Sequence, residues 1–180
     1  GLLKNTDQAM YEAKRTGRNR YQFFTKEMQS HAVTRLQLAS ELHQAIKDQE
    51  FRLVYQPILD LKNGNVEKAE TLIRWQKDSG DIVRPVEFIK VAEETHLINE
   101  FGDWVFLEAS RQTQLWRQKI SEKFQIAVNT SPIQFENRLG ESWIRYLEKL
   151  DIDGSAIGIE ITENLLMGSS SQVRDNLLGF

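Results

Sequence analysis

Segment 53–75 consists of two apolar runs separated by a short polar turn: LVYQPILDLKNGNVEKAETLIRW. The turn letters at 63–65 are Asn-Gly-Asn, and both residue types tolerate the positive φ angles of tight hairpin turns. The pattern therefore predicts a β-hairpin with strands over 53–61 and 66–75. Glu70 lies inside the second predicted strand. Because a buried carboxylate is costly unless a partner neutralises it, Glu70 is expected either at a strand end or as a ligand.

The overall composition excludes several classes of protein. Of the 180 residues, 40% are hydrophobic and 27% are charged, and the formal net charge is −3. This balance is typical of one globular domain or of parts of two, and it gives no reason to expect a nucleic acid polymer as a partner. The absence of cysteine excludes disulfides and thiolate metal sites.

The sequence also contains no pattern typical of a membrane-spanning or membrane-targeting segment. No apolar run reaches the ~20 residues of a membrane-spanning helix, and no segment resembles a signal peptide. We therefore expect no membrane segment in this chain and a cytoplasmic location. Membrane attachment of a parent protein, through a region before Gly1, stays open.

The first fifty residues predict two helices and a strand between them. A helix is expected over 9–14, ended by Gly17, and an aromatic strand over 19–24. Segment 26–50 contains neither Gly nor Pro and carries apolar residues at spacings of three and four. This spacing predicts one long helix with a narrow apolar seam, which suits a linker between two modules.

From residue 66 onward, predicted strands and helices alternate. Helices are expected over 86–99, 101–119, 136–150 and 172–178, and strands over 124–130 and 157–162. Such alternation implies an α/β fold with a parallel sheet, either open and doubly wound or closed as a (β/α)₈ barrel. No GxGxxG or GxxxxGK[ST] loop follows a strand, which favours the barrel. The barrel would be incomplete, because a closed one takes about 250 residues.

The strand predicted over 124–130 has a continuous apolar run, IAV at 126–128. An uninterrupted apolar run is typical of a parallel strand that is buried on both faces, whereas a strand with one solvent-exposed face alternates apolar and polar residues. The sequence therefore predicts burial of this strand on both faces.

Three of the predicted strands carry an oxygen-bearing side chain near their ends: Glu70, Asn129 and Glu160. In a βα barrel the C-terminal strand ends converge on one mouth, where active sites are built. Two carboxylates and one amide form a hard-oxygen ligand set that suits Mg²⁺ or Mn²⁺ better than zinc. Taken singly, each also has a local explanation, such as capping the turn that follows.

The amino-acid sequences of several segments resemble those of known signalling domains. Segment 7–24, DQAMYEAKRTGRNRYQFF, resembles the last helix and strand of GGDEF diguanylate cyclase domains. Further along stand, in order, YQPILDL, ETLIRW, PVEFIKVAEET, VNTSPIQF and EITE. Together these resemble the EAL domain of cyclic-di-GMP phosphodiesterases. The resemblance implies a GGDEF remnant over 1–25, a helical linker over 26–40 and the N-terminal portion of an EAL domain over 41–180.

The EAL resemblance implies a fold, a reaction and a set of site residues. The fold is a partial TIM-type (β/α)₈ barrel whose first strand is antiparallel to the others. The reaction is hydrolysis of cyclic-di-GMP to linear pGpG with Mg²⁺ or Mn²⁺, and active family members often pair as homodimers. The residues implied are Glu70, Asn129 and Glu160 as metal ligands, Glu70 and Glu163 as catalytic residues, and Gln56, Leu72, Arg74 and Pro85 as substrate-binding residues.

Two departures from the family pattern affect this expectation. The signature reads ETL, with Thr71 where the family usually has Ala, although strand alternation predicts that Thr71 faces away from Glu70. The sequence also stops at LGF, 178–180, before the expected strand with the family's DDFGTGYS aspartates. We therefore expect the 180-residue chain to be inactive by itself and its parent protein to be the enzyme. Two alternatives stay open: a non-catalytic cyclic-di-GMP receptor and a scaffold without a ligand.

Overall fold

The structure is a computed structural model that describes residues 2–15, 17, 19–135 and 139–161. The chain divides into two compact units, Gly1–Gln44 and Ala45–Phe180. Within the described residues, no helix combines the length and the apolar character that a membrane crossing requires.

The first unit is built from two helices, α1 (Leu2–Arg15) and α2 (Lys26–Lys47), the second of which ends just beyond the unit. Gly17 ends the first helix, as predicted: its φ is +117° and its N–H donates to the Lys14 carbonyl oxygen at 3.4 Å. Both predicted helices are confirmed, and α1 begins earlier than expected.

The strand predicted over 19–24 is wrong, since the described residues of this segment form no strand. Tyr21 and Phe23 are 83% and 78% exposed, and the centroids of their rings lie 5.6 Å apart. A strand depends on hydrogen bonds from a neighbouring strand, and none of the described strands pairs with this segment. Aromatic content alone is therefore not enough to form one.

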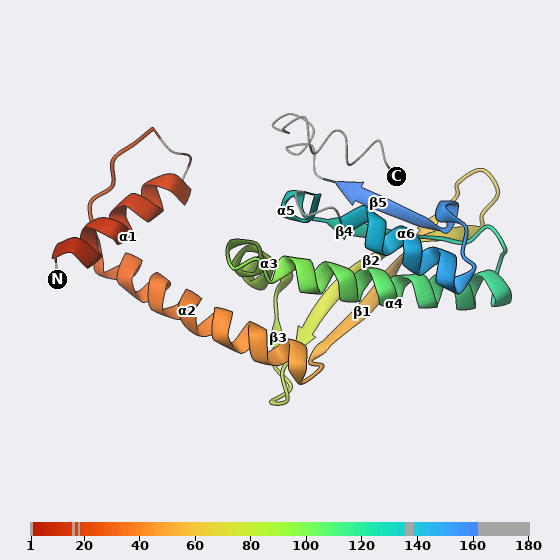
Figure 1. The fold of residues 1–180 in the computed structure, drawn as a ribbon, viewed down its shortest axis with the longest axis horizontal. Coiled ribbons are helices and arrows are strands. Elements are labelled where there is room, and N and C mark those ends of the chain that lie inside the picture. Colours follow the sequence, from red (N-terminus) through yellow and green to blue (C-terminus); the bar gives the residue numbers. More distant parts are fainter. Residues whose placement is uncertain (1, 16, 18, 136–138, 162–180) are drawn as a thin grey trace. The chain divides into compact units, whose positions relative to one another are not determined.

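The second unit is an α/β sheet with helices (Figure 1). Its elements are β1 (Phe51–Leu59), β2 (Val66–Gln76), β3 (Ile82–Val83), α3 (Pro85–Glu94), α4 (Ile98–Lys119), β4 (Gln125–Thr130), α5 (Pro132–Phe135), α6 (Leu139–Leu150), a 3₁₀ turn (Gly154–Ala156) and β5 (Ile157–Ile161). The sheet order is β1-β2-β4-β5, with β3 paired to β2. The β1–β2 pair is antiparallel, while β2–β4 and β4–β5 are parallel. The predicted hairpin is confirmed, with Gly64 at φ +74°.

Two helices of the second unit differ in extent from the sequence prediction, and one of them is α4, which begins at Ile98 rather than at 101. Helix α3 ends at Glu94 rather than near 99, because the Thr95 hydroxyl donates to the Val91 carbonyl oxygen at 2.7 Å and His96 adopts a φ of +59°. The helix predicted over 136–150 corresponds to α6, which is described from Leu139, and residues 136–138 lie outside the described residues. The helix predicted over 172–178 lies outside the described residues.

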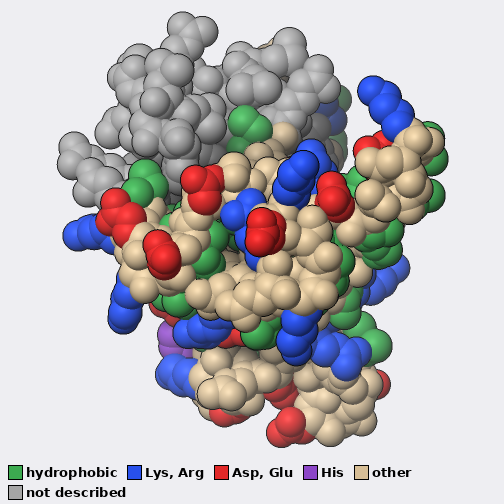
Figure 2. Space-filling view, turned by 90° about the vertical axis from the view of Figure 1, so that its right-hand side faces the viewer, with side chains coloured by type: hydrophobic (Ala, Val, Ile, Leu, Met, Phe, Trp, Pro, Cys, Tyr) green, Lys and Arg blue, Asp and Glu red, His purple; other side chains and the backbone are tan. Residues whose placement is uncertain are grey.

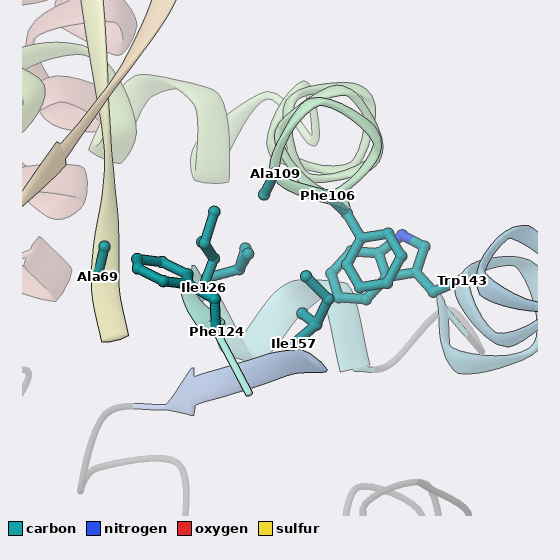
Figure 3. Packing of buried hydrophobic residues seen from close by; sticks show 8 residues of the cluster. Ala69, Phe106, Ala109, Phe124, Ile126, Trp143 and Ile157 are labelled. Atoms are coloured by element: carbon teal, nitrogen blue, oxygen red, sulfur yellow. The ribbon is translucent and has the colours of Figure 1, made fainter. Parts of the chain in front are cut away.

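One face of the sheet packs against helices (Figure 3). Ala69 on β2 and Ile126 on β4 point toward Phe106 and Ala109 of α4, and Trp143 of α6 stacks on Phe106. The buried cluster consists of Ala69, Phe106, Ala109, Phe124, Ile126, Val128, Trp143 and Ile157. We call the side of the sheet that carries Ala69, Ile126 and Val128 the core face.

The prediction that β4 is buried on both faces is wrong for the described residues. Ile126 and Val128 are buried, whereas Ala127 is only partly buried and Asn129 is exposed. Successive side chains of a strand point to opposite faces, and here the described helices cover only the core face. The other face, which we call the open face, is therefore where exposed polar side chains of β2, β4 and β5 are found.

Figure 2 shows the end of the molecule that lies on the right in Figure 1, where β1 and β2 are joined. Acidic and basic side chains are interspersed over the part of this end that is drawn in colour. A continuous basic surface is the electrostatic footprint of nucleic acid binding. The described side chains on this end do not form one.

Tyr55 on β1 makes stability depend on pH in the alkaline range. Burial, and secondarily the nearby charge of Glu108, raises the pKa of Tyr55 to about 12. Above the ordinary tyrosine pKa of about 10, the unfolded chain loses a proton that the folded chain keeps, so unfolding becomes easier. We expect the free energy of unfolding to fall as the pH rises from 10 to 12, measured by urea titration. Tyr55→Phe should flatten this fall, and an equal fall in the variant would contradict the assignment.

Candidate functional site

The register of the sheet places four predicted site residues on the open face. Gln56 of β1 is the cross-strand partner of Glu70 on β2, and Glu70 is the partner of Ala127 on β4. Asn129, two residues further along β4, is the partner of Glu160 on β5. Directly paired residues and alternate residues of a strand project to the same face. Gln56, Glu70, Asn129 and Glu160 therefore share the face opposite the core cluster.

Glu70 and Asn129 are in direct contact. Nδ2 of Asn129 donates to Oε1 of Glu70 at 2.7 Å, although the two residues are 59 positions apart in the sequence. The bond fixes the orientation of the amide, so that its Oδ1 is directed away from the carboxylate oxygen that Nδ2 contacts. Glu70 is partly buried, while Asn129 and Glu160 are exposed. The structure thus brings two of the three predicted ligands together and places the third on the adjoining strand.

This group offers hard-oxygen ligands only, with neither imidazole nor thiolate. Such ligands fit Mg²⁺ or Mn²⁺, which prefer carboxylate and carbonyl oxygens. Among the described residues, no group of three or more His, Asp or Glu side chains is arranged to hold a metal ion. The side-chain oxygens of Glu70, Asn129 and Glu160 are nevertheless of the type that a divalent cation prefers, and the three side chains lie on the same face of the sheet. They form part of a ligand set. Glu163, also predicted for this site, lies outside the described residues.

The residues predicted to contact substrate continue from Glu70 toward the end of β2. Leu72 and Arg74 follow at alternate positions, so both lie on the open face and both are partly buried. Nη1 of Arg74 donates to the Ile73 carbonyl oxygen at 2.9 Å, which anchors one nitrogen of the guanidinium group. Pro85 is the first residue of α3, just after β3, which pairs with the last residues of β2.

Thr71 points to the core face, as predicted from strand alternation. Its side chain is 3% exposed, and its Oγ1 is buried without a hydrogen-bond partner among the described residues. Thr71 therefore lies on the side of the sheet opposite Glu70. A threonine at this position is expected to affect packing and stability.

The unpaired hydroxyl of Thr71 yields a stability prediction. Thr71→Val keeps the branched shape and removes the hydroxyl, so we expect the free energy of unfolding to rise by roughly 1 kcal/mol. Thr71→Ala should give a smaller gain, because it also removes a buried methyl group worth about 0.8 kcal/mol. Urea denaturation of the three proteins, followed by circular dichroism, measures both changes. A less stable Thr71→Val would show that the hydroxyl has a partner.

A cavity of about 440 Å³ lies elsewhere, between the end of α2, β1 and α4. Its walls include Phe51, Phe101 and Trp104. Phe51 alternates with the open-face residues of β1, so it belongs to the core face. This cavity is therefore separate from Glu70 and Asn129, and its walls also include the polar side chains of Gln49, Glu100 and Glu108.

Sequence reasoning gave no role to three residues near the end of β4. The backbone N–H of Ser131 donates to Oε1 of Gln134, and the Ser131 hydroxyl donates to Oε1 of Glu93 on α3. The spacing Ser-x-x-Gln, which is typical of a helix capping box, was the available signal for the first contact. No local pattern indicates the second, because its partners are 38 positions apart.

Comparison with known proteins identifies the family. The model of the EAL domain matches residues 39–178, more than half of the chain. The bifunctional diguanylate cyclase/cyclic di-GMP phosphodiesterase MucR of Pseudomonas aeruginosa is 38% identical over 92% of this chain and 24% of its own length. The cyclic di-GMP phosphodiesterase PdeR of Escherichia coli is 33% identical over 92% of this chain and 25% of its own length. The chain thus spans about a quarter of the length of these relatives.

Solved structures agree with the sequence comparison. The phosphodiesterase of MucR, in complex with c-di-GMP, superposes with a TM-score of 0.74 at 33% identity, over 79% of this chain and 58% of that chain. The EAL enzyme Bd1971, bound to cAMP and cyclic-di-GMP, superposes with a TM-score of 0.76 at 25% identity, over 99% of this chain and 47% of that chain. The α/β sheet with an antiparallel first strand pair is therefore the fold of EAL domain structures, and the chain belongs to the EAL domain family.

Proposed function

We propose that this chain is the N-terminal portion of a phosphodiesterase domain that hydrolyses cyclic-di-GMP to linear pGpG with Mg²⁺ or Mn²⁺. The observation that carries the proposal is the contact of Asn129 with Glu70 on the open face, with Glu160 level with Asn129 on the next strand. Relatives named as cyclic di-GMP phosphodiesterases support it.

In this proposal Glu70, Asn129 and Glu160 hold the divalent cation through their side-chain oxygens. The chemistry that a bound Mg²⁺ or Mn²⁺ supplies is activation of a water molecule and neutralisation of charge on the phosphodiester. Asn129 also orients Glu70, because its Nδ2 donates to the carboxylate and so fixes it. Glu163 is proposed as a further catalytic residue, from its place in the EITE motif.

The substrate is proposed to lie along β2, over the open face. Arg74 suits a phosphate of the dinucleotide, because its planar guanidinium can bind two oxygens at once. Gln56 lies level with Glu70 across the hairpin, and Leu72 lies between Glu70 and Arg74 on the same face. Pro85 is proposed as a contact at the start of α3.

Two finer assignments extend the proposal beyond the described sheet. The sheet is proposed to be the first part of a TIM-type (β/α)₈ barrel, with the open face as the barrel interior. Residues 1–25 are proposed to be the tail of a GGDEF domain, on the sequence of segment 7–24, and residues 26–40, within α2, to be the linker.

Binding measurements on the full-length protein test the proposed substrate site. Isothermal titration with cyclic-di-GMP in EDTA should show binding, which Arg74→Ala weakens by about tenfold or more, because a hydrogen bond to a charged group contributes about 1.5–3 kcal/mol. Arg74→Lys keeps the positive charge but cannot bind two phosphate oxygens at once, so its affinity for cyclic-di-GMP should lie between those of the wild type and Arg74→Ala. Undiminished affinity in Arg74→Ala would contradict the assignment of Arg74.

A second candidate function is that of a cyclic-di-GMP receptor without catalysis. It is motivated by one observation, the ETL signature, in which Thr71 follows Glu70 where the resembled family usually has Ala. Binding with no hydrolysis by the full-length protein would support this candidate over the enzyme.

A further inference from the structure

The turn after β4 is fastened by side chains that the proposed site does not use. Ser131 is the first residue beyond β4; its N–H donates to Oε1 of Gln134 at 2.9 Å and its hydroxyl donates to Oε1 of Glu93 at 2.7 Å. Glu93 lies on α3, the helix that follows β2 and β3. The contact therefore joins the end of the strand that carries Asn129 to the helix that follows the strand of Glu70.

The Ser131 hydroxyl is not used to cap α5. In a capping box, the side chain of the first residue bonds to the backbone N–H three residues on, and the fourth residue reaches back. Here Gln134 does reach back, but its own N–H donates to the Ser131 carbonyl oxygen at 3.0 Å, while the Ser131 hydroxyl turns to Glu93. The hydroxyl thus contributes a contact between two elements.

Gln134 is held in place at some cost to stability. Its side chain is 2% exposed, and its Nε2 is buried without a partner among the described residues. It packs against Gly102 of α4, where an added Cβ would lie 1.5 Å from Nε2 and 2.7 Å from Cδ. An apolar side chain would fill this space without the penalty of about 1–3 kcal/mol for an unpaired polar group. What an apolar side chain could not do is bind the N–H of Ser131.

The position of Asn129 explains why such an anchor is needed. The register between β2 and β4 ends at Thr71 and Val128, one residue before Asn129. Pairing with β5 continues through Asn129 and Thr130, so on the side of β2 no ladder holds the backbone from which Asn129 reaches Glu70. We propose that Ser131 is a positioning residue, which Glu93 and Gln134 anchor so that Asn129 faces Glu70 and completes the cation site. This inference rests on the proposed function, in particular on a divalent cation at Glu70 and Asn129.

Equilibrium binding of Mn²⁺ to the full-length protein, measured from the electron paramagnetic resonance signal of free Mn²⁺, tests the proposal. Outer partners of metal ligands typically contribute about 10–100-fold in affinity, so Ser131→Ala and Glu93→Ala should each weaken binding by about tenfold. Glu93→Gln keeps an oxygen acceptor for the hydroxyl and should recover most of the affinity. The matched control is Ser110→Ala, which removes a buried serine hydroxyl that donates to a backbone oxygen within α4, that of Phe106.

Thermal unfolding of each variant, recorded in parallel, separates positioning from general destabilisation. We expect Ser110→Ala to lower the melting temperature without changing Mn²⁺ affinity. Equal Mn²⁺ affinities for Ser131→Ala and Ser110→Ala would overturn the role of Ser131 while leaving the proposed function intact, provided that Glu70→Ala loses Mn²⁺. If Glu70→Ala binds Mn²⁺ with the same affinity as the wild type, both the proposed cation site and the positioning role of Ser131 are contradicted.

Discussion

Glu70→Ala in the full-length protein is expected to lower the turnover of cyclic-di-GMP by on the order of 10³-fold, because a metal-held water and charge neutralisation contribute several kcal/mol to phosphodiester cleavage. The variant removes a proposed ligand and also the acceptor of the 2.7 Å bond from Asn129. Chromatographic quantification of pGpG under saturating substrate measures the effect. Retained turnover in Glu70→Ala would overturn the assignment of this residue.

A matched control lies on the same strand. Glu67 is also a glutamate of β2, but it lies on the core face, two residues before Ala69, and its Oε1 accepts a hydrogen bond from Ser121 at 3.1 Å. Glu67→Ala should therefore keep turnover within about threefold of the wild type, since Glu67 faces away from the proposed site and the substitution removes one hydrogen bond worth about 0.5–1.5 kcal/mol of stability. Glu70→Gln keeps the size and an oxygen acceptor but not the charge, and it should be nearly as inactive as Glu70→Ala.

Trp143→Ala is expected to have the largest effect on stability, a loss of about 3–5 kcal/mol, as is typical when a buried aromatic side chain is truncated. Trp143 is 3% exposed and stacks on Phe106 with the ring centroids 4.1 Å apart and an angle of 11° between the planes. Its loss would open the space between α4 and α6 over the core face (Figure 3). Urea denaturation of the 180-residue chain, followed by far-UV circular dichroism, measures the change.

Two controls separate the parts of this effect. Trp143→Phe keeps a ring in the stack but loses the bond that Nε1 donates to Oδ1 of Asp103 at 2.8 Å, so a loss of about 1–2 kcal/mol is expected. Ile144, the next residue, is 38% exposed, and Ile144→Ala should cost under about 1 kcal/mol. A Trp143→Ala chain no less stable than the Ile144→Ala chain would contradict the packing of α6 on the sheet.

Local sequence patterns predicted most of the sheet, because the hairpin depends on turn residues and on apolar runs that lie next to each other in the chain. Gly64 supplies the positive φ of the turn, and the order of the longer elements from β2 to β5 was predicted correctly, whereas the short β3 and α5 were not predicted. Interactions between distant residues caused the errors. The aromatic segment 19–24 has no strand to pair with among the described residues, and whether β4 is covered on its second face depends on elements outside the described sheet.

The candidate site was predictable to the extent that it depends on strand alternation and residue chemistry. Glu70 and Thr71 fall on opposite faces, as alternation requires, and the register places Asn129 beside Glu160. The hydrogen bond between Glu70 and Asn129 could not be derived from spacing, since it depends on the parallel register between β2 and β4. The contact of Ser131 with Glu93 was missed for the same reason.

The central claim is that the open face of this sheet belongs to a metal-dependent cyclic-di-GMP phosphodiesterase. The most direct measurement incubates the full-length protein with cyclic-di-GMP in Mn²⁺, in EDTA and in EDTA followed by excess Mn²⁺, with the products separated by chromatography. We predict linear pGpG in Mn²⁺, intact substrate in EDTA and recovery of pGpG on addition of excess Mn²⁺. Intact cyclic-di-GMP in all three conditions, despite measurable binding, would contradict the enzyme and identify a receptor.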